Sequence, residues 1–472
     1  MRSFDLCVIG SGPAGQKAAI QASKLGKRVC IVERAEVVGG AAINTGTIPS
    51  KALREAILTA TGKSPFMPRF ADFLSARGRV SLADLIMACQ TIIKNEIGIV
   101  RGHFSSNGID LINGTGSFRD ANTVEIASEH SNELVKADKI CIAVGTRPSK
   151  PDNIAFDDVD VITSDELLHL QQLPLSMIVV GGGVIGTEYA SMLAALGVKV
   201  TLIEGRNKLL DFVDSEITEA LQYHLRQAGV TLRMGEKVVK IHKVEPPPGA
   251  RTTNNVMAEA VLESGKTLRA DCLLYAIGRQ GATRGLNLEA AGLTADDRGR
   301  IKVNAHLQTA VPNIYAAGDV IGFPALASTS MEQGRLAACS MFGETCPSYG
   351  NTLPYGIYSI PEISMVGWTE EQLTKDGIPY EAGVAQYREI ARGQLLGDEI
   401  GMLKLLIHQE SRTILGVHAI GTGATELIHI GQAAMAFGAT VDYFVNAVFN
   451  WPTLAECYKV AALNGVNKLR NV

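Results

Sequence analysis

Two short glycine-rich segments of this chain have the spacing of phosphate-binding turns. They are residues 10–15 (GSGPAG) and 181–186 (GGGVIG). Each follows an apolar stretch that predicts a buried strand, and each precedes a helical pattern, a second apolar stretch and a glutamate. The glutamate is Glu33 in the first copy and Glu204 in the second, at the same distance from the first glycine. Both copies therefore carry the whole βαβ fingerprint of dinucleotide binding, which a lone glycine motif would not establish.

Each part of the fingerprint has a physical role. The first glycine permits the turn, the second lets the backbone approach a pyrophosphate, and the third lets helix pack on strand. The pyrophosphate lies at the helix N-terminus, where free N–H groups favour anions, and the glutamate accepts the ribose hydroxyls. Two such sites indicate a bound flavin dinucleotide and a diffusing nicotinamide dinucleotide. The predicted binding residues are Gly10, Gly12, Pro13, Ala14, Gly15, Glu33 and Arg34 for the first, and Gly181, Gly183, Val184, Ile185, Gly186, Glu204 and Arg206 for the second.

Three further apolar stretches end in glycine: 139–144, 272–277 and 313–317. Ligands of open α/β sheets sit at the carboxyl ends of the strands, where these glycines are expected. Asp319, just after the third stretch, is predicted to hydrogen-bond the ribityl chain of the flavin, with a helix N-cap as its alternative role. Gly40, Gly116, Gly145, Gly278 and Ala327 complete the predicted cofactor-binding set.

The composition excludes several classes of function. The chain has 472 residues, 46% of them hydrophobic and 19% charged, with a net charge of −4. The chain lacks the excess of basic residues that would indicate nucleic-acid binding. It also has no apolar run that reaches the ~20 residues of a membrane span. The eight cysteines are scattered without metal-ligand spacing, so neither a metal site nor a disulfide framework is expected. A strand begins within a few residues of Met1, which leaves no room for a signal peptide, and a reducing cytoplasm is the expected location.

The segment at 39–51 (GGAAINTGTIPSK) resembles the redox-active stretch of the flavoprotein disulfide reductases. The resemblance covers the whole chain, including the turn at 145–148, the pair at 278–279, the pair at 318–319 and the stretch at 355–367 (YGIYSIPEISMVG). Members that reduce disulfides carry two cysteines five positions apart. Here those positions hold Ala42 and Thr47, and without a thiol pair no electrons can be relayed to a disulfide substrate.

Within that superfamily the chain looks most like the soluble pyridine nucleotide transhydrogenases. Their threonine-containing segment appears at 46–54 (GTIPSKALR), and the tail at 449–456 (FNWPTLAE) agrees again. Trp451 stands where disulfide-reducing relatives place a catalytic histidine. These transhydrogenases usually keep the first cysteine, so Ala42 departs from their pattern.

The resemblance implies roles for three residues. Lys51 is expected beside the flavin N5, paired with Glu188, and Thr47 is expected to offer a hydroxyl to the isoalloxazine. The carboxylate of Glu204 suits the free 2′-hydroxyl of NAD(H), whereas Arg206 and the nearby Lys208 either bind the 2′-phosphate of NADP(H) or are exposed loop charges. The cofactors are therefore FAD, NAD(H) and NADP(H).

The expected fold is α/β, with two Rossmann-like dinucleotide-binding domains and a C-terminal α+β dimerisation domain. An FAD domain comprises 1–150 and 280–349, an NAD(P) domain is inserted at 151–279, and a dimerisation domain follows at 350–472. Strands are expected at 357–364, 403–408 and 414–420, backed by a helix at 425–437. The stretches at 64–79 and 246–255 are predicted as loops, the second within a hairpin.

The resemblance implies a homodimer or higher homo-oligomer in which each C-terminal segment closes the flavin site of the other subunit. His429 is assigned to interface packing rather than catalysis. The expected activity is Si-specific transhydrogenation between NADPH and NAD⁺ through the flavin, by a ping-pong mechanism. An NAD(P)H diaphorase or quinone reductase, and a non-catalytic FAD-bearing nucleotide sensor, remain as alternatives.

Overall fold

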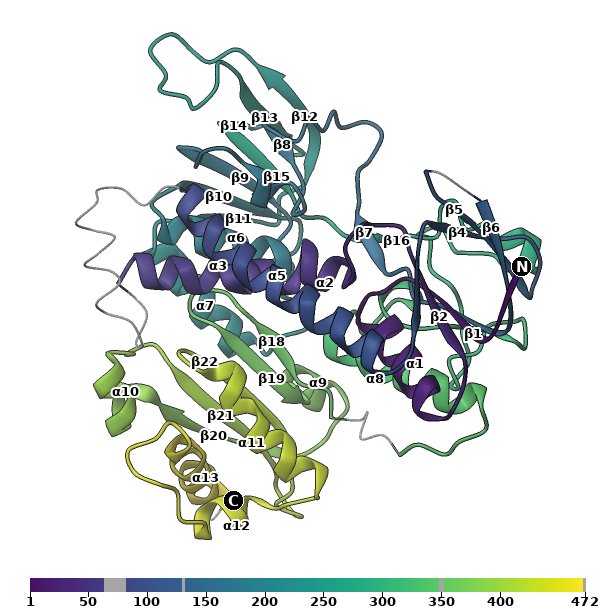
Figure 1. The fold of residues 1–472 in the computed structure, drawn as a ribbon. Coiled ribbons are helices and arrows are strands. Elements are labelled where there is room, and N and C mark those ends of the chain that lie inside the picture. The colour runs from purple at the N-terminus through teal and green to yellow at the C-terminus, as the bar shows by residue number, and fades with distance from the viewer. Residues whose placement is uncertain (63–81, 130–131, 348–351, 470–472) are drawn as a thin grey trace.

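A computed structural model describes residues 1–62, 82–129, 132–347 and 352–469 (Figure 1). The loop predicted at 64–79 lies outside these residues and stays a prediction. The described chain forms three main sheets with helices packed on them, as expected for an α/β protein with a C-terminal α+β unit. No helix in the described part of the chain is long and apolar enough to cross a membrane.

The first sheet is built around the first glycine-rich segment. Its strand order is β3-β2-β1-β6-β5-β4, and β17 pairs with β6 beside it. Strands β1, β2, β3, β6 and β17 run parallel, and helices α1 and α8 pack against each other over them. The bounds are β1 Arg2–Ile9, α1 Pro13–Lys24, β2 Val29–Glu33, β3 Asp110–Asn113, β4 Thr115–Phe118, β5 Thr123–Ala127, β6 Asn132–Ile142, β17 Ile314–Ala316 and α8 Ala327–Met341.

The second sheet repeats this plan around the second glycine-rich segment. Its parallel strands have the order β11-β10-β9-β15-β8, and an antiparallel sheet β12-β13-β14 extends from it at the top of Figure 1. The loop predicted at 246–255 joins β12 to β13, which confirms the hairpin. The bounds are β8 Val161–Ile162, β9 Ser176–Val180, α6 Val184–Ala195, β10 Lys199–Glu204, α7 Ser215–Gln227, β11 Thr231–Met234, β12 Val238–Val244, β13 Met257–Leu262, β14 Thr267–Ala270 and β15 Cys272–Tyr275.

Two short strands mark where the chain leaves the first sheet and returns to it. Strand β7 (Thr146–Pro148) pairs antiparallel with β16 (Arg279–Gly281). The guanidinium of Arg279 reinforces the pair, because its Nε donates to Thr146 Oγ1 at 2.8 Å. The second unit is therefore connected to the first by two adjacent passages of chain.

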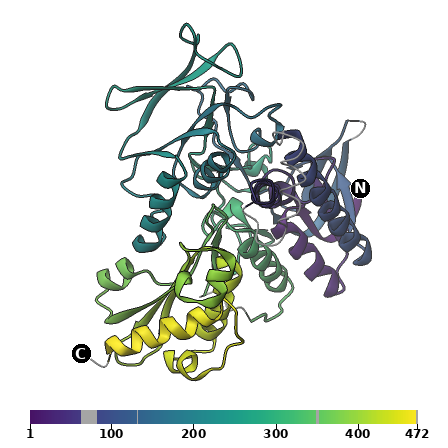
Figure 2. The same ribbon diagram turned by 90° about the vertical axis from the view of Figure 1, so that its left-hand side faces the viewer.

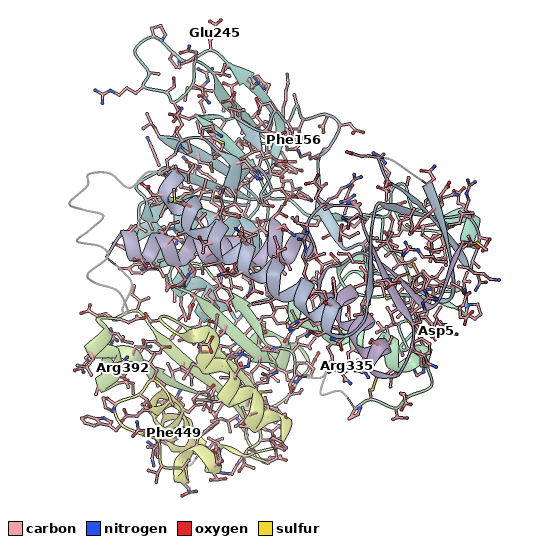
Figure 3. All side chains as sticks on the ribbon, viewed as in Figure 1. Asp5, Phe156, Glu245, Arg335, Arg392 and Phe449 are labelled. Carbon is pink, nitrogen blue, oxygen red and sulfur yellow. A yellow bond between two sulfur atoms is a disulfide. The ribbon has the colours of Figure 1, made fainter. Side chains whose placement is uncertain are left out.

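The third sheet is antiparallel, with the order β18-β19-β22-β21-β20. Helix α11 packs on β19 and β22, and helix α13 packs on β20 and β21 (Figure 2, yellow helices). Figure 3 shows Phe449 in this unit, at the opposite end of the molecule from Glu245 on the β12–β13 hairpin. The bounds are β18 Tyr355–Ile357, β19 Ile363–Gly367, α9 Glu370–Lys375, β20 Tyr380–Gln386, β21 Met402–His408, β22 Ile414–Ile420, α11 Ala424–Ala436 and α13 Glu456–Leu469.

The prediction of a single strand at 357–364 is wrong, because β18 and β19 are two antiparallel strands joined by a loop at 358–362. The backbone N–H groups there bond to helix α6 instead of to a strand. That of Tyr358 donates to Glu188 at 2.8 Å, and that of Ile360 donates to Ser191 Oγ at 3.0 Å. Pro361 has no N–H to give. This loop thus joins the third sheet to the second unit.

The structure contains one disulfide, which the scattered spacing of the cysteines does not predict. Cys339, in helix α8, is bonded to Cys346, seven positions later. The other six cysteines are free and buried. A pair near a helix end can meet because the chain turns back after Met341, a geometry that the spacing of cysteines in the sequence does not reveal.

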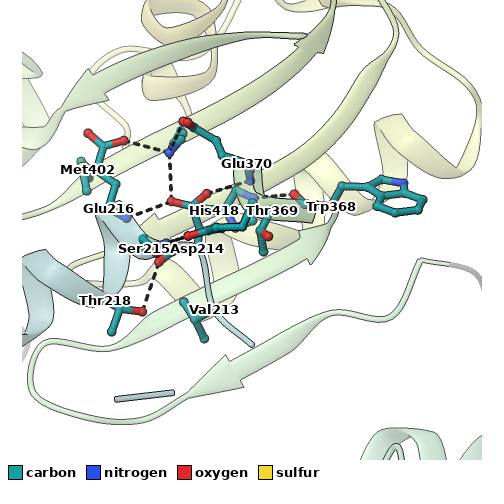
Figure 4. Close-up of polar contacts among 12 residues, drawn as sticks. Val213, Asp214, Ser215, Glu216, Thr218, Trp368, Thr369, Glu370, Met402 and His418 are labelled. Carbon is teal, nitrogen blue, oxygen red and sulfur yellow. Dashed lines mark hydrogen bonds and ion pairs between the residues drawn. The ribbon is translucent and has the colours of Figure 1, made fainter. Parts of the chain in front are cut away.

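A polar cluster around the buried pair Lys404–Asp214 joins α7 of the second unit to the third sheet (Figure 4). Lys404, on β21, contacts three carboxylates: Asp214 just before α7, Glu216 within it, and Glu370 on α9. Apolar contacts reinforce this junction, since one core cluster contains residues of α3 (Thr47–Ala60), α6, α7, β9, β19 and β22. The second unit and the third sheet are therefore packed as one body.

Candidate functional site

A cavity of about 840 Å³ lies where the three units meet. Its walls come from the glycine turn after β1, the short helix α2 (Gly40–Asn44), the start of α3, the start of α6 and strand β18. The predicted residues that line it are Gly10, Gly12, Pro13, Ala14, Glu33, Arg34, Gly40, Thr47, Lys51, Gly116, Gly145, Val184, Ile185, Glu188, Asp319 and Ala327. Gly15, Gly181, Gly183, Gly186, Glu204, Arg206 and Gly278 are not among its lining residues.

The turn after β1 has the shape of a phosphate cradle. Gly10 has φ +105°, a conformation that favours glycine, and nothing lies within 4 Å of where a Cβ of Gly12 would be. A Cβ on Gly15 would lie 2.0 Å from Gly10 O, so helix α1 approaches the turn as closely as the fingerprint requires. Glu33, at the end of β2, accepts hydrogen bonds from the N–H and Oγ of Ser11 at 2.9 and 2.6 Å.

The turn after β9 repeats this geometry. A Cβ on Gly186 would lie 1.9 Å from Gly181 O, and the position beside Gly183, the N-cap of α6, is open. The carboxylate of Glu204 accepts from the N–H of Gly182 at 2.6 Å. Both predicted cradles are therefore present, each with its glutamate at the end of the neighbouring strand.

Lys51 and Glu188 form the predicted ion pair in the cavity wall. Lys51 Nζ lies 2.9 and 2.8 Å from the two carboxylate oxygens of Glu188, whose side chain is only 4% exposed. Tyr358, which the sequence did not single out, completes the arrangement. Its backbone N–H donates to Glu188, and its ring centroid lies 4.8 Å from Lys51 Nζ. A fixed positive charge thus faces the cavity, oriented from three different units.

The positions that carry sulfur in disulfide-reducing relatives lie in the same wall. Ala42 is in α2, and Thr47 is the first residue of α3. Both line the cavity, and no cysteine is found among the described residues around it. The six free cysteines lie buried elsewhere, and burial raises the pKa of several of their thiols, to about 11 for Cys89 and about 12 for Cys141.

Asp319 lies beneath the cavity between two hydroxyls. Thr146 Oγ1 donates to it at 3.3 Å and Ser330 Oγ donates at 3.2 Å. Its alternative role as a helix N-cap is wrong, because Gly318 holds that position and Asp319 is the first residue of a 3₁₀ turn. The carboxylate is held at a fixed point of the cavity wall, where it can accept a hydrogen bond from a ligand hydroxyl.

The two basic residues that follow Glu204 point to different partners. Arg206 Nε and one terminal nitrogen each lie 3.0 Å from a different oxygen of Glu204, and the other terminal nitrogen contacts Asp211. Burial would raise the pKa of Glu204, but Arg206 and the surrounding N–H groups hold it below its usual value. Lys208 instead donates to Ser215 Oγ at 3.0 Å. Only the first of these two cations lies at the expected ribose site.

Comparison with known proteins agrees with this geometry. Residues 4–334 match the family model of the pyridine nucleotide-disulphide oxidoreductases, and residues 353–462 match the dimerisation domain of that family. The chain belongs to the pyridine nucleotide-disulphide oxidoreductases. As a member of that family it is an oxidoreductase that binds FAD and NAD(P)(H), for which the two cradles provide the matching backbone shape.

The chain is similar over its full length to proteins of one activity. It is 52% identical to the soluble pyridine nucleotide transhydrogenase of Mycobacterium bovis, over 100% of this chain and 98% of that one. It is 45% identical to the protein of the same name from Photobacterium profundum, over 99% and 98%. Among solved structures, the HOCl-induced flavoprotein disulfide reductase RclA from Escherichia coli has a TM-score of 0.85 at 26% identity, covering 98% of this chain and 99% of that one. LpdA from Mycobacterium tuberculosis shares the fold, with a TM-score of 0.86 at 24% identity and the same coverage.

Two residues of the C-terminal unit that the sequence singles out lie at different places relative to the cavity. Trp451 is 67% exposed. His429, on α11, lines the cavity, and its Nδ1 lies 2.7 Å from Gln432 Oε1. The sequence also missed Asp165, a cavity residue whose burial raises the pKa of its carboxyl despite the nearby charge of Arg279. Tyr358 lies in the stretch at 355–367 that carries the family resemblance, but nothing in the sequence places it or Asp165 in the cavity wall, because each reaches the cavity from a different unit.

Proposed function

We propose that this chain is an FAD-dependent NAD(P)⁺ transhydrogenase that catalyses NADPH + NAD⁺ ⇌ NADP⁺ + NADH. The carrying observation is the cavity wall that holds Lys51 and Glu188 but has Ala42 and Thr47 where a disulfide reductase needs sulfur. The names of the full-length relatives support the same activity. Bound FAD would supply the two-electron hydride chemistry that connects the two nicotinamides.

The residues of the chain bind and orient the two dinucleotides and set the charge at the cavity wall. The cradle at 10–15 and Glu33 hold the FAD pyrophosphate and ribose, and Asp319 holds the ribityl chain. The second cradle, with Glu204 at its end, holds the nicotinamide dinucleotide, so both substrates use one site in turn and the kinetics are ping-pong. Lys51 supplies a positive charge that favours negative charge developing nearby, and Glu188 fixes its position. Thr47 offers a hydroxyl to the same end of the cavity.

Several finer assignments belong to this proposal. Transfer is of the Si-specific type, and the chain works as a homodimer in the cytoplasm. The FAD domain comprises 1–150 and 280–349, the NAD(P) domain 151–279 and the dimerisation domain 350–472. The dimerisation model that matches residues 353–462 supports the homodimer. In that dimer the segment around Trp451 closes the flavin site of the other subunit.

Anaerobic spectroscopy of the purified protein tests the proposal. NADPH is expected to bleach the flavin absorbance, and thio-NAD⁺ is then expected to restore it while thio-NADH forms. Lipoamide and glutathione disulfide should not restore it at comparable rates. A flavin that stays oxidised with NADPH would indicate a nucleotide sensor, and a flavin restored by quinones but not by thio-NAD⁺ would indicate a diaphorase. Either result overturns the proposal.

Substitutions at the ion pair test the assigned roles. Lys51→Met and Glu188→Gln are each expected to lower turnover with NADPH and thio-NAD⁺ by at least about tenfold, because each removes or misplaces the fixed charge. The double variant should lose little more than either single one, since coupled residues act as a unit. Turnover of the Thr47→Ala variant shows how much the hydroxyl of Thr47 contributes. Unchanged turnover in Lys51→Met, with flavin content retained, contradicts the role of the lysine.

A further inference from the structure

The turn after β11 is tied to the end of β10, where the adenosine ribose of the nicotinamide dinucleotide is expected. Glu236 donates its N–H to Glu204 O at 3.1 Å, and Gly235 donates its N–H to Arg206 O at 3.0 Å. These two backbone bonds extend the parallel pairing of β10 and β11 past the ends of the strands. The position of Lys237, the next residue, is therefore fixed relative to Glu204 and Arg206.

The side chain of Lys237 lies across Gly205, the residue between Glu204 and Arg206. A Cβ built on Gly205 would be 3.2 Å from Lys237 Cγ and 3.9 Å from Lys237 Cε. Glycine at 205 thus leaves the space that the methylene chain of the lysine occupies. Both residues are exposed on this edge, so the ammonium can reach a ligand held at the carboxyl end of β10.

The ammonium of Lys237 has no hydrogen bond or ion pair within the described ranges. The adjacent acid, Glu236, is already engaged, because Ser264 Oγ lies 2.9 Å and Lys266 Nζ 3.1 Å from its Oε1. The other two cations near Glu204 are also committed: Arg206 to Glu204 and Asp211, and Lys208 to Ser215 and Glu371.

Without Lys237, the charged side chains at this edge have a net negative charge, which disfavours an anionic ligand. Glu204, Arg206 and Asp211 together carry a net charge of −1, which suits the neutral ribose hydroxyls of NAD(H) and repels a 2′-phosphate. Lys237 is the cation that brings the group to neutrality. Lysine binds phosphate as a compact point charge, without the fixed fork that holds Arg206 on its carboxylates.

We propose that Lys237 binds the 2′-phosphate of NADP(H) and thereby lets a site built around Glu204 accept both nicotinamide dinucleotides. This inference depends on the proposed function, because it requires that NAD(H) and NADP(H) both bind at this site. It assigns the selectivity for the phosphate to the turn after β11, and not only to Glu204 at the end of β10 and Arg206 just after it. NAD(H) gains nothing from Lys237, because it has no charge at the 2′ position.

Direct binding to the FAD-loaded protein tests this inference. Calorimetry with NADP⁺ and NAD⁺, and with adenosine 2′,5′-bisphosphate and adenosine 5′-monophosphate, is compared between the wild type, Lys237→Gln and Lys240→Gln. Lys240 is an exposed lysine on the adjoining strand β12, so its substitution makes the same change in charge. In Lys237→Gln the affinity for NADP⁺ relative to NAD⁺ is expected to fall about tenfold, as for loss of one charged hydrogen bond. The affinity for adenosine 2′,5′-bisphosphate relative to adenosine 5′-monophosphate should fall in the same way.

The control variants and the affinity ratio test the role of Lys237 independently of whether the protein is a transhydrogenase. Lys240→Gln should leave the ratio unchanged, and Lys237→Arg should restore most of it. Adding salt should weaken NADP⁺ binding more in the wild type than in Lys237→Gln, because screening acts on the extra charge pair. A ratio that is the same in Lys237→Gln and the wild type overturns the inference, even if transhydrogenation is observed. A fall in the ratio supports it, even if the turnover assay fails.

Discussion

Lys404 Nζ lies 2.9 Å from Asp214 Oδ1 at a point where neither side chain is more than 1% exposed. The same ammonium lies 2.9 Å from Glu216 and 2.5 Å from Glu370. Burial acts to lower the pKa of Lys404, but the three carboxylates outweigh it and raise the pKa above its usual value. Asp214 is also the N-cap of α7, accepting the N–H of Glu216 at 3.2 Å. One cation therefore connects the nucleotide-binding unit to the third sheet.

Removal of this cation is expected to destabilise the protein strongly. Lys404→Met leaves Asp214 buried without a counter-charge, which typically costs about 3–5 kcal/mol. Thermal unfolding should show a lower midpoint, whereas Lys375→Met, at an exposed position on α9, should shift it little. The double variant Lys404→Met/Asp214→Asn should recover part of the loss, because the two carboxylates that then lack a counter-charge, Glu216 and Glu370, are partly exposed to solvent. A midpoint for Lys404→Met equal to that of the wild type contradicts a structural role for the pair.

His418, on β22, makes stability depend on pH near the same junction. Its Nε2 lies 2.8 Å from Trp368 O, and its buried Nδ1 has no partner among the described residues. Burial lowers the pKa of the imidazole, with Lys404 acting in the same direction and Asp214 and Glu371 acting against it. The folded state therefore binds fewer protons than the unfolded state, in which a histidine titrates near pH 6.5.

Stability is accordingly expected to fall as pH drops below about 6.5, by up to about 1.4 kcal/mol per pH unit until the pKa of folded His418 is reached. Burial acts to raise the pKa of Glu371, but hydrogen bonds with Ser215 and Thr369 lower it to about 2, so that carboxylate stays ionised in this range. His418→Gln keeps a hydrogen-bond donor but does not titrate. Its unfolding midpoint should vary less than that of the wild type between pH 5 and 7. Parallel curves for the two proteins would rule out His418 as the titrating group.

The sequence predicted the parts of the site that are local. Both cradles and their glutamates follow from short-range spacing. The Lys51–Glu188 pair joins residues 137 positions apart, and only the family resemblance predicted it. The contacts of Lys404 and of Tyr358 were not found, since they join segments far apart in the chain and depend on how the units pack. The break after β18 was missed for the same reason: the N–H groups of 358 and 360 bond to α6, which no local pattern shows.

The disulfide between Cys339 and Cys346 is expected to add to stability. Closing a loop of this length in the unfolded chain is worth about 2.5 kcal/mol on the chain-entropy model. Dithiothreitol should therefore lower the unfolding midpoint of the oxidised wild-type protein, and Cys346→Ser should not respond to it. Mass spectrometry after thiol alkylation, with and without reduction, reports whether the bond is formed in the purified protein. A fully alkylated Cys339 in the protein that has not been reduced contradicts its formation.

The close approach of Gly15 and Gly186 to their own turns should allow the two nucleotide sites to be disabled one at a time. A Cβ would lie 2.0 Å from Gly10 O in the first case and 1.9 Å from Gly181 O in the second, so each helix must shift away from its turn. Gly15→Ala is expected to lose FAD, which the ratio of flavin absorbance to protein absorbance measures. Gly186→Ala should keep FAD yet bind NADPH at least about tenfold more weakly and bleach only at high NADPH, because the shift costs about 1–3 kcal/mol at the second turn. Ala19→Gly on α1 is a control that leaves the turn free of added atoms. Loss of FAD from Gly186→Ala, with the protein still folded, would show that the two cradles do not serve separate nucleotides.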